Sequence, residues 1–187
     1  DGRWDEITYT QLATQVDALA HVLVQDLGLV PGNRVLLRGF NGHWMTVASL
    51  ATVKAGMVAV TTMPMLRATE LRVVIERAQC RVALCDARLL EELTTAAASA
   101  PVLEAVHVWG GDDPSWLEMA MARHTTPFTP CETASDDVVL IAFTSGTTGV
   151  PKGCMHFHRD VMAMCHGFSA QLLQLTSQDR CIGTPPI

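Results

Sequence analysis

Short runs of Val, Leu, Ile and Ala alternate with longer amphipathic segments along most of this chain. The short runs have the length and composition of strands, whereas the longer segments space their apolar residues three or four positions apart, as helices do. We expect strands at 34–38, 57–61, 81–85 and 105–108, and helices at 41–55, 68–78 and 87–98. A further helix is expected between a cap at Thr10 and a stop at Gly28, and Asn41 is the expected cap of the next helix. Repeated units of this kind predict an α/β fold with a mostly parallel sheet.

The segment 110–134 breaks this pattern. It contains two adjacent glycines, three prolines and many threonines around one short helical piece at 116–123, and we interpret it as a connection to the next part of the sheet. The near-continuous apolar run at 138–143 is typical of a strand buried on both faces. We therefore predict an N-terminal α/β subdomain at 1–134 and the start of a second subdomain at 135–187.

A polar, glycine-rich loop follows this apolar run directly. It reads Thr144, Ser145, Gly146, Thr147, Thr148, Gly149, Val150, Pro151, Lys152 and Gly153. Glycines allow the backbone to turn tightly, so that successive N–H groups can form a concave anion site. Hydroxyl groups can donate to phosphate oxygens, and a lysine adds a mobile positive charge. The loop therefore predicts a phosphate-binding site.

A plain surface turn between two strands is the alternative, because turns rich in Gly and Thr are common. The position of the loop after a buried strand and its ending in Pro-Lys-Gly favour phosphate binding. The Walker pattern requires a glycine directly before the lysine, whereas Pro151 precedes Lys152 here. The dinucleotide pattern GxGxxG is also absent from this loop. A P-loop GTPase and a Rossmann dehydrogenase are therefore disfavoured.

The sequence TSGTTGVPKG at 144–153 resembles the phosphate-loop motif of the adenylate-forming superfamily, which contains acyl- and aryl-CoA ligases, luciferases and the adenylation domains of peptide synthetases. Shorter similarities lie in the matching order along the chain. They are the segments 7–12, 53–56, 155–161 and 183–187. The resemblance thus covers nearly the whole chain and implies the N-terminal part of the large domain of such an enzyme.

The resemblance implies a two-step reaction with ATP, Mg²⁺ and CoA. A carboxylate attacks the α-phosphorus of ATP to give an acyl-adenylate and pyrophosphate, and the CoA thiol then displaces AMP. By position, Thr144, Ser145, Gly146, Thr147, Thr148 and Gly149 would hold the β- and γ-phosphates, with Lys152 beside them. His156 would border the acyl pocket, as residues near this loop do in the family.

The segments 63–71 and 183–187 look most like benzoate- and aminobenzoate-CoA ligases, which implies a small aromatic carboxylic acid as substrate. Two alternatives stay open. One is a peptide-synthetase adenylation domain, which would activate an amino acid. The other is a non-catalytic nucleotide-binding module from a truncated gene.

Several parts of the family's active site would follow Ile187. They are the adenine-binding segment, the ribose-binding aspartate, the hinge between domains and the catalytic lysine of the small C-terminal domain. We therefore expect no catalytic residue within these 187 residues and no complete adenylation by them alone. Because the chain starts with Asp1, we also expect it to begin inside a longer protein.

Composition limits the partners. The formal net charge is −6 and no basic stripe recurs, so we expect no nucleic-acid partner. No apolar run reaches ~18 residues, so no membrane span is expected. Six cysteines without a CxxC pair predict reduced thiols and a cytoplasmic protein. If the parent sheet continues beyond the chain, an exposed strand edge would favour a homo-oligomer.

A zinc site is the remaining alternative. Cys154, His156 and His158 would share one face if all three lay on a strand. No second pair of ligands with the usual spacing accompanies them, so we expect no metal site. We interpret the segment as a strand that runs into the next helix, with His158 or Asp160 near its cap.

Overall fold

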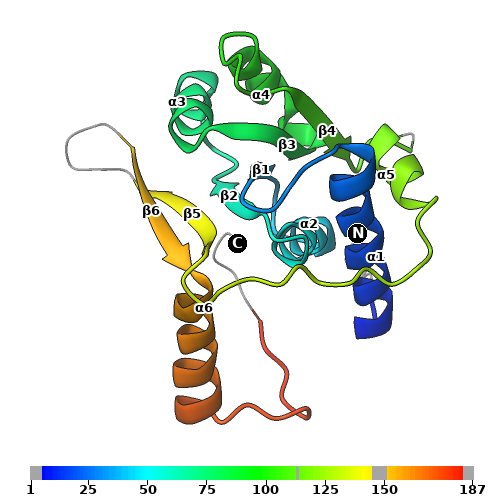
Figure 1. Cartoon of the computed structure of the whole chain (residues 1–187), viewed down its shortest axis with the longest axis vertical. Coiled ribbons are helices and arrows are strands. Elements are labelled where there is room, and N and C mark those ends of the chain that lie inside the picture. Colours follow the sequence, from blue (N-terminus) through cyan, green and yellow to red (C-terminus); the bar gives the residue numbers. More distant parts are fainter. Residues whose placement is uncertain (1–5, 113, 145–150, 183–187) are drawn as a thin grey trace.

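A six-stranded sheet forms the centre of the molecule (Figure 1). The computed structural model describes residues 6–112, 114–144 and 151–182. The strand order is β4-β3-β1-β2-β5-β6; the pairs from β4 to β5 are parallel and β6 is antiparallel to β5. The strands are β1 Arg34–Arg38, β2 Val58–Thr62, β3 Cys80–Asp86, β4 Ala105–Trp109, β5 Val138–Thr144 and β6 Lys152–Phe157. The predicted α/β fold with a mostly parallel sheet is confirmed.

Helices cover both faces of this sheet. They are α1 Tyr9–His21, which continues as the π-helical turn η1 Val22–Asp26, α2 His43–Lys54, α3 Ala68–Ala78, the 3₁₀ turn η2 Ala87–Leu89, α4 Leu90–Ala97 and α5 Trp116–Met121. The helix α6 His158–Met164 and the π-helical η3 Cys165–Leu172 follow β6, contain no buried residue and extend away from the sheet (Figure 1). One core holds α1, α2 and α5 against the sheet, and the other holds α3 and α4. Alternate residues of β1 enter the two cores, with Val35 and Leu37 in the first and Leu36 in the second.

Two helix caps differ from the sequence predictions. Thr8, rather than Thr10, caps α1, because its hydroxyl accepts from the Gln11 N–H at 3.2 Å and the Gln11 side chain accepts from the Thr8 N–H at 2.8 Å. This reciprocal pair needs Gln or Glu three residues after the cap, a spacing that Thr8 has. Gly42, rather than Asn41, precedes the first residue of α2. The bounds of β1 and α3 match the predictions.

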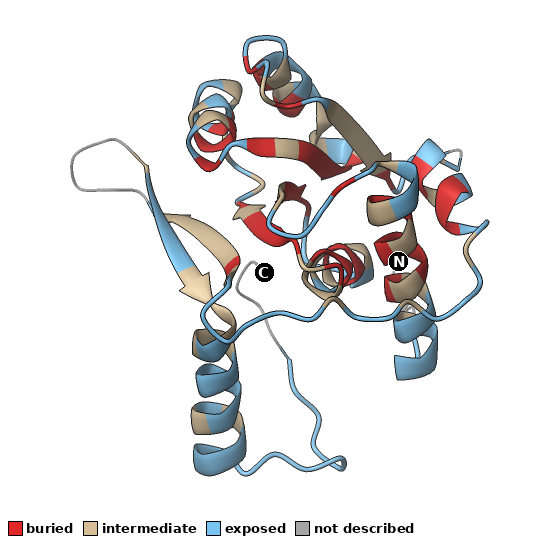
Figure 2. Ribbon diagram, in the orientation of Figure 1, coloured by how far each residue is buried: buried red, intermediate tan, exposed pale blue. Residues whose placement is uncertain are grey.

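The strand β5 is less buried than its apolar sequence predicts (Figure 2). Only Val139 among its residues is buried, whereas Leu140, Ile141 and Phe143 are partly exposed. The physical reason is its position, since β5 pairs with β2 over only three residue pairs and then with the largely exposed β6. Leu140 contacts the edge of one core, and Ile141 and Phe143 contact the edge of the other.

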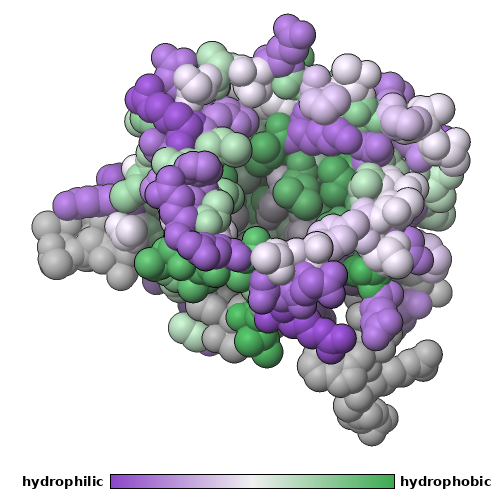
Figure 3. Space-filling model, turned by 90° about the horizontal axis from the view of Figure 1, so that it is seen from below, coloured by the Kyte–Doolittle hydropathy of each residue, from purple (hydrophilic) through white to green (hydrophobic). Residues whose placement is uncertain are grey.

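Large apolar side chains are also exposed beyond β5. They include Met155 on β6, Met162 and Met164 on α6, and Phe168 and Leu172 on η3. Viewed from below, the molecule shows apolar side chains gathered around a hollow, with hydrophilic side chains at its rim (Figure 3). The predicted self-association and the predicted subdomain boundary at 134/135 stay predictions.

The connection at 110–134 follows the prediction and contains the expected short helix, α5. It returns to the sheet past the end of α2, where the Cys131 N–H donates to the Lys54 carbonyl at 2.9 Å. Gly56 makes this approach possible, because its φ is +76° and an added Cβ would lie 2.6 Å from Cys131 Sγ. In the described part of the chain, no helix has both the length and the apolarity needed to cross a membrane.

Candidate functional site

The two ends of the predicted phosphate loop meet at the tip of the β5–β6 hairpin. Thr144 is the last residue of β5, Lys152 is the first residue of β6, and the two are Cα partners in the antiparallel register. Both residues are exposed. The predicted binding residues Ser145, Gly146, Thr147, Thr148 and Gly149 lie outside the described residues. The hairpin therefore places one hydroxyl and one ammonium group on opposite sides of the loop's base.

A small residue allows this hairpin to close. Gly153 follows Lys152 and pairs with Phe143, and an added Cβ would lie 3.1 Å from the side chains of both Ile141 and Phe143. The side chains of Ile141 and Phe143 fill the space beside the glycine and contact the core around α3. The glycine that ends the sequence motif therefore packs against the strand that precedes the loop.

A cleft of about 410 Å³ lies beside the hairpin at the carboxyl ends of β2 and β5. The chain leaving β2 returns toward β3, whereas the chain leaving β5 turns outward to β6. Adjacent parallel strands with connections in opposite directions leave a crevice at their carboxyl ends, where α/β proteins bind ligands. The cleft is lined by Thr61, Thr62, Met63, Leu66, Glu70, Val74, Ala142, Phe143, Thr144 and Pro151. Thr144 thus belongs to both the loop and the cleft.

Buried Arg38 fixes one wall of this cleft. The residue is 1% exposed, and its guanidinium donates to the carbonyls of Met63, Pro64 and Leu66 at 3.0–3.1 Å, and to that of Leu89 at 3.3 Å. Burial lowers the pKa of Arg38 from its ordinary value. The side chain thereby holds the segment after β2 in place, since a guanidinium has five N–H donors in a fixed arrangement.

The start of α3 continues the same wall and is fixed by Glu92 of α4. The Glu92 carboxylate accepts from Arg67 Nη1 and from the Ala68 N–H, both at 2.8 Å. The hydrogen bond from Arg67, together with that from Ala68, lowers the pKa of Glu92. At the other end of α3, Arg77 Nη1 donates to the Pro151 carbonyl at 3.1 Å. The helix α3 therefore links the cleft wall to the residue before Lys152.

His156 lies on β6, four residues after Lys152. It is partly buried on β6, opposite Leu140, and shares a strand face with Lys152 and Cys154. It is not among the residues that line the cleft, so its predicted place at an acyl pocket stays a prediction.

The predicted strand-to-helix transition occurs at Phe157 and His158. The helix α6 begins at His158, so this residue does not share the strand face of Cys154 and His156. Asp160 lies at the cap as expected, because its carboxylate accepts from the Phe157 N–H at 2.9 Å. No group of three His, Cys, Asp or Glu side chains in the described ranges is arranged to hold a metal ion.

Sequence reasoning did not find Arg38, Arg77 or the cleft. The sequence contains one signal for Arg38, since this charged residue directly follows the apolar residues Val35, Leu36 and Leu37 of a predicted strand. Arg77 gave none, because it lies on α3 far from the loop in the sequence. Its contact with Pro151 arises only when β6 joins the sheet.

Known proteins match the chain along its length. The sequence profile described as AMP-binding enzyme matches residues 1–187. The benzoate–CoA ligase of Thauera aromatica is 28% identical over 172 residues, which are 92% of this chain and 33% of that enzyme. The nonribosomal peptide synthetase gliP of Aspergillus fumigatus is 36% identical over 155 residues, which are 83% of this chain and 7% of that protein.

The fold is also found among solved structures. The crystal structure of the anthranilate CoA ligase AuaEII in complex with anthranoyl-AMP superposes with a TM-score of 0.83 at 22% identity. The match covers 89% of this chain and 33% of that one. The chain therefore spans about a third of the length of the benzoate–CoA ligase and of the anthranilate CoA ligase that it resembles.

Proposed function

The chain belongs to the family of AMP-binding enzymes, and from this premise we propose that it forms the ATP-phosphate-binding part of an acid–CoA ligase. In the whole protein, a carboxylate attacks the α-phosphorus of ATP and releases pyrophosphate, and the CoA thiol then displaces AMP. The observation that carries this proposal is the β5–β6 hairpin, which holds Thr144 opposite Lys152 at the base of the loop.

The loop binds the β- and γ-phosphates in this proposal. Lys152 supplies a positive charge, and the hydroxyls and backbone N–H groups of 144–149 supply hydrogen bonds. Local donors are needed because the chain's net charge of −6 does not attract a polyphosphate. Arg77 holds Pro151 and so fixes the approach to Lys152. Preorganised donors of this kind stabilise the charge that develops on the leaving pyrophosphate.

Mg²⁺ accompanies the nucleotide in this proposal and neutralises charge on its phosphate oxygens. Mg²⁺ in nucleotide sites is typically held by the phosphates, waters and only one or two protein side chains. Among the described residues at the base of the loop, Thr144 has a hydroxyl oxygen that could coordinate Mg²⁺.

An aromatic carboxylic acid is the proposed substrate. The benzoate–CoA ligase of Thauera aromatica is similar over 92% of this chain, and the segment 63–71 resembles this group of ligases. Part of that segment, from Met63 to Leu66, forms the cleft wall that Arg38 fixes. The peptide-synthetase relative favours the second candidate, an adenylation domain that activates an amino acid.

Two lysines allow a direct test of the phosphate site. Lys54 and Lys152 are the lysines of this sequence, and Lys54 forms an ion pair with Asp17 whereas Lys152 is exposed. We would acetylate the chain briefly with and without Mg²⁺-ATP and measure each modified peptide by mass spectrometry. ATP should protect Lys152 and leave the modification of Lys54 unchanged. Equal modification of Lys152 at saturating ATP would refute the proposed phosphate site.

The substrate requires a second measurement on the longer protein that contains this chain. Pyrophosphate release would be followed with a panel of benzoates and a panel of amino acids, each with and without CoA. Release with benzoates, together with CoA thioester formation, supports the ligase. Release only with amino acids supports the adenylation domain, and ATP binding without any release supports a non-catalytic module.

A further inference from the structure

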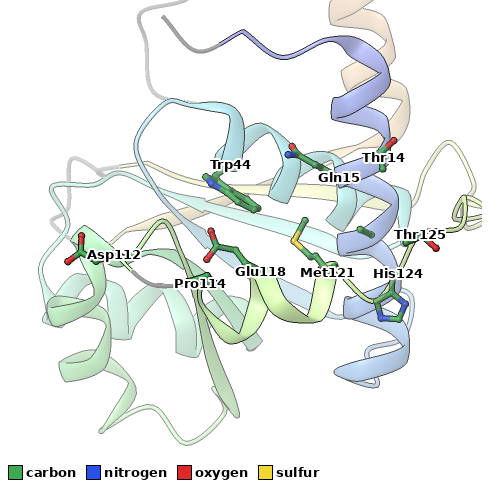
Figure 4. Close-up of a pocket in the computed structure, with 12 residues that line it drawn as sticks. Thr14, Gln15, Trp44, Asp112, Pro114, Glu118, Met121, His124 and Thr125 are labelled. Carbon is green, nitrogen blue, oxygen red and sulfur yellow. The ribbon is translucent and has the colours of Figure 1, made fainter. Parts of the chain in front are cut away.

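A second cavity lies between α1, the start of α2 and the segment around α5 (Figure 4). Its volume is about 630 Å³, which is within the range of small-molecule sites in proteins. The lining residues are Thr14, Gln15, Ala18, Trp44, Gly111, Asp112, Pro114, Glu118, Met121, Ala122, His124 and Thr125. None of them lines the cleft beside the phosphate loop, so the cavity is separate from the site proposed above.

The apolar part of the cavity suits a flat ring. The Trp44 indole and the Met121 side chain reach into the same space from α2 and α5 (Figure 4). Ala18 of α1 adds a further apolar contact. Aromatic rings stack favourably on an indole, and a thioether makes favourable contacts with an aromatic ring. This combination therefore favours an aromatic ligand over an aliphatic chain.

The polar groups of the cavity favour a ligand that donates hydrogen bonds. The Gln15 side-chain oxygen is buried and has no hydrogen-bond partner among the described residues. A buried polar atom without a partner costs free energy, which a ligand donor would recover if the Gln15 side chain turned its oxygen toward the cavity. Gln15 and Glu118 extend toward the space beside Trp44 from opposite sides (Figure 4).

The charge of the cavity is negative. The Glu118 carboxylate accepts from the Ser115 N–H at 2.8 Å through one oxygen, and its other oxygen has no hydrogen bond within the described part of the chain, so it can accept from a ligand. Asp112 adds a second carboxylate at the rim. His124 lines the cavity as well, but its Nε2 lies 3.0 Å from Asp26 and is engaged there. A cation would thus be attracted by Glu118 and, through the indole face, by Trp44.

We propose that this cavity binds a small aromatic amine, with its ring between Trp44 and Met121 and its ammonium group at Glu118 and Gln15. This site is independent of the ATP site, and either can exist without the other.

Two probes of equal length test the chemistry. Phenethylamine and 3-phenylpropionate share the ring and the two-carbon chain but end in an ammonium and a carboxylate, respectively. Binding to the chain would be measured by isothermal titration calorimetry and by the change in Trp fluorescence. We expect phenethylamine to bind and 3-phenylpropionate to bind at least about tenfold more weakly, since a charge-assisted hydrogen bond is exchanged for repulsion.

Three variants locate the binding. Glu118→Gln removes the charge but keeps an oxygen that can accept from the Ser115 N–H, so α5 remains capped. Trp44→Leu removes the ring surface. Glu91→Gln removes one exposed carboxylate from α4, on the other side of the sheet, and is the control. Circular dichroism would verify that each variant is folded.

Both Glu118→Gln and Trp44→Leu should weaken phenethylamine binding about tenfold or more, and Glu91→Gln should leave it unchanged. The proposal is wrong if phenethylamine does not bind at about 10 mM, a concentration that would detect even very weak binding. It is equally wrong if the acid binds as well as the amine in this cavity, or if folded Glu118→Gln and Trp44→Leu variants retain wild-type affinity.

Discussion

Thr144 and Lys152 face each other across the β5–β6 hairpin, although seven residues lie between them in the sequence. The hairpin converts a linear motif into a loop with both ends fixed. Fixed ends reduce the conformational entropy that the loop loses when it closes on a ligand. The same arrangement attaches the loop to α3 through Arg77 and Pro151.

The charge of Lys152 should dominate the affinity for ATP. We expect Lys152→Met to weaken Mg²⁺-ATP binding by about tenfold or more, because a charge-assisted hydrogen bond contributes about 1.5–3 kcal/mol. Lys152→Arg should retain most of the affinity since the charge is kept. Titration calorimetry measures both variants. Arg180→Met, which removes an exposed cation near the end of the described chain, serves as the control.

Removal of Arg38 should destabilise the fold. Arg38→Met breaks four partly buried hydrogen bonds to backbone carbonyls, and we expect the free energy of unfolding to fall by about 3 kcal/mol. Arg38→Lys should recover only part of this, because an ammonium has three donors and no planar arrangement. Urea unfolding measures the loss.

Exposed Arg72 provides the matched control for this experiment. It forms an i,i+4 ion pair with Glu76 at 3.6 Å, and both side chains are more than 40% exposed. Arg72→Met should change the free energy of unfolding by less than about 0.5 kcal/mol. Equal losses for Arg38→Met and Arg72→Met would contradict a specific role of Arg38.

Gly56 should tolerate alanine less well than Gly28 does. Both have positive φ values, +76° and +61°, so alanine strains the backbone at each position by about 1 kcal/mol. At Gly28 nothing lies within 4 Å of an added Cβ, whereas at Gly56 the Cβ would lie 2.6 Å from Cys131 Sγ. We expect Gly56→Ala to cost about 1–3 kcal/mol more than Gly28→Ala.

A second substitution separates the two causes at Gly56. In a protein that carries Cys131→Gly, the clashing side chain is absent and only Pro31 Cβ, at 3.3 Å, stays close to the added Cβ. Measured relative to Cys131→Gly alone, Gly56→Ala should then cost little more than Gly28→Ala costs in the wild type. Thermal unfolding of Gly28→Ala, Gly56→Ala, Cys131→Gly and the double variant gives the comparison. If the double variant is as unstable as the sum of its single changes, the close contact is not the cause.

Two buried thiols should make the protein less stable in alkali. Burial raises the pKa of Cys80 and of Cys85 to about 12, from 9.0 for an ordinary thiol. Because the folded state disfavours the thiolate, the stabilisation is fully present below about pH 9 and is lost as the pH rises toward about 12. Urea unfolding between these values should show a decline that is shallower in Cys80→Ala/Cys85→Ala.

Exposed thiols offer a control on the same protein. Cys154, Cys165 and Cys181 are exposed, and we expect iodoacetamide to modify them at pH 8 well before Cys80 and Cys85. Peptide mass spectrometry reads each position. Rapid modification of Cys80 or Cys85 in the folded protein would show that these thiols are not protected by burial.

Local pattern was sufficient for several elements. The bounds of β1 and α3 agree with the prediction because hydrophobic period and chain breaks are properties of the segment itself. The cap of α1 has a sequence signal as well, since Gln11 follows Thr8 at the capping-box spacing, which Thr10 lacks. The phosphate-binding chemistry of the loop at 144–153 also rests on residue types in one continuous run, and it stays a prediction.

The sequence by itself determined the alternation of strands and helices and the family to which the chain belongs, whereas the phosphate-binding role of the loop stays a prediction. Tertiary structure alone decided the strand order and the partial exposure of β5. It also decided the hydrogen bonds of Arg38 to the segment after β2, the cleft beside the hairpin and the cavity beside Trp44. The physical reason is the long sequence separation between the residues that make these contacts. Strand pairing and burial depend on contacts between segments far apart in the chain, and no local period records which segments meet.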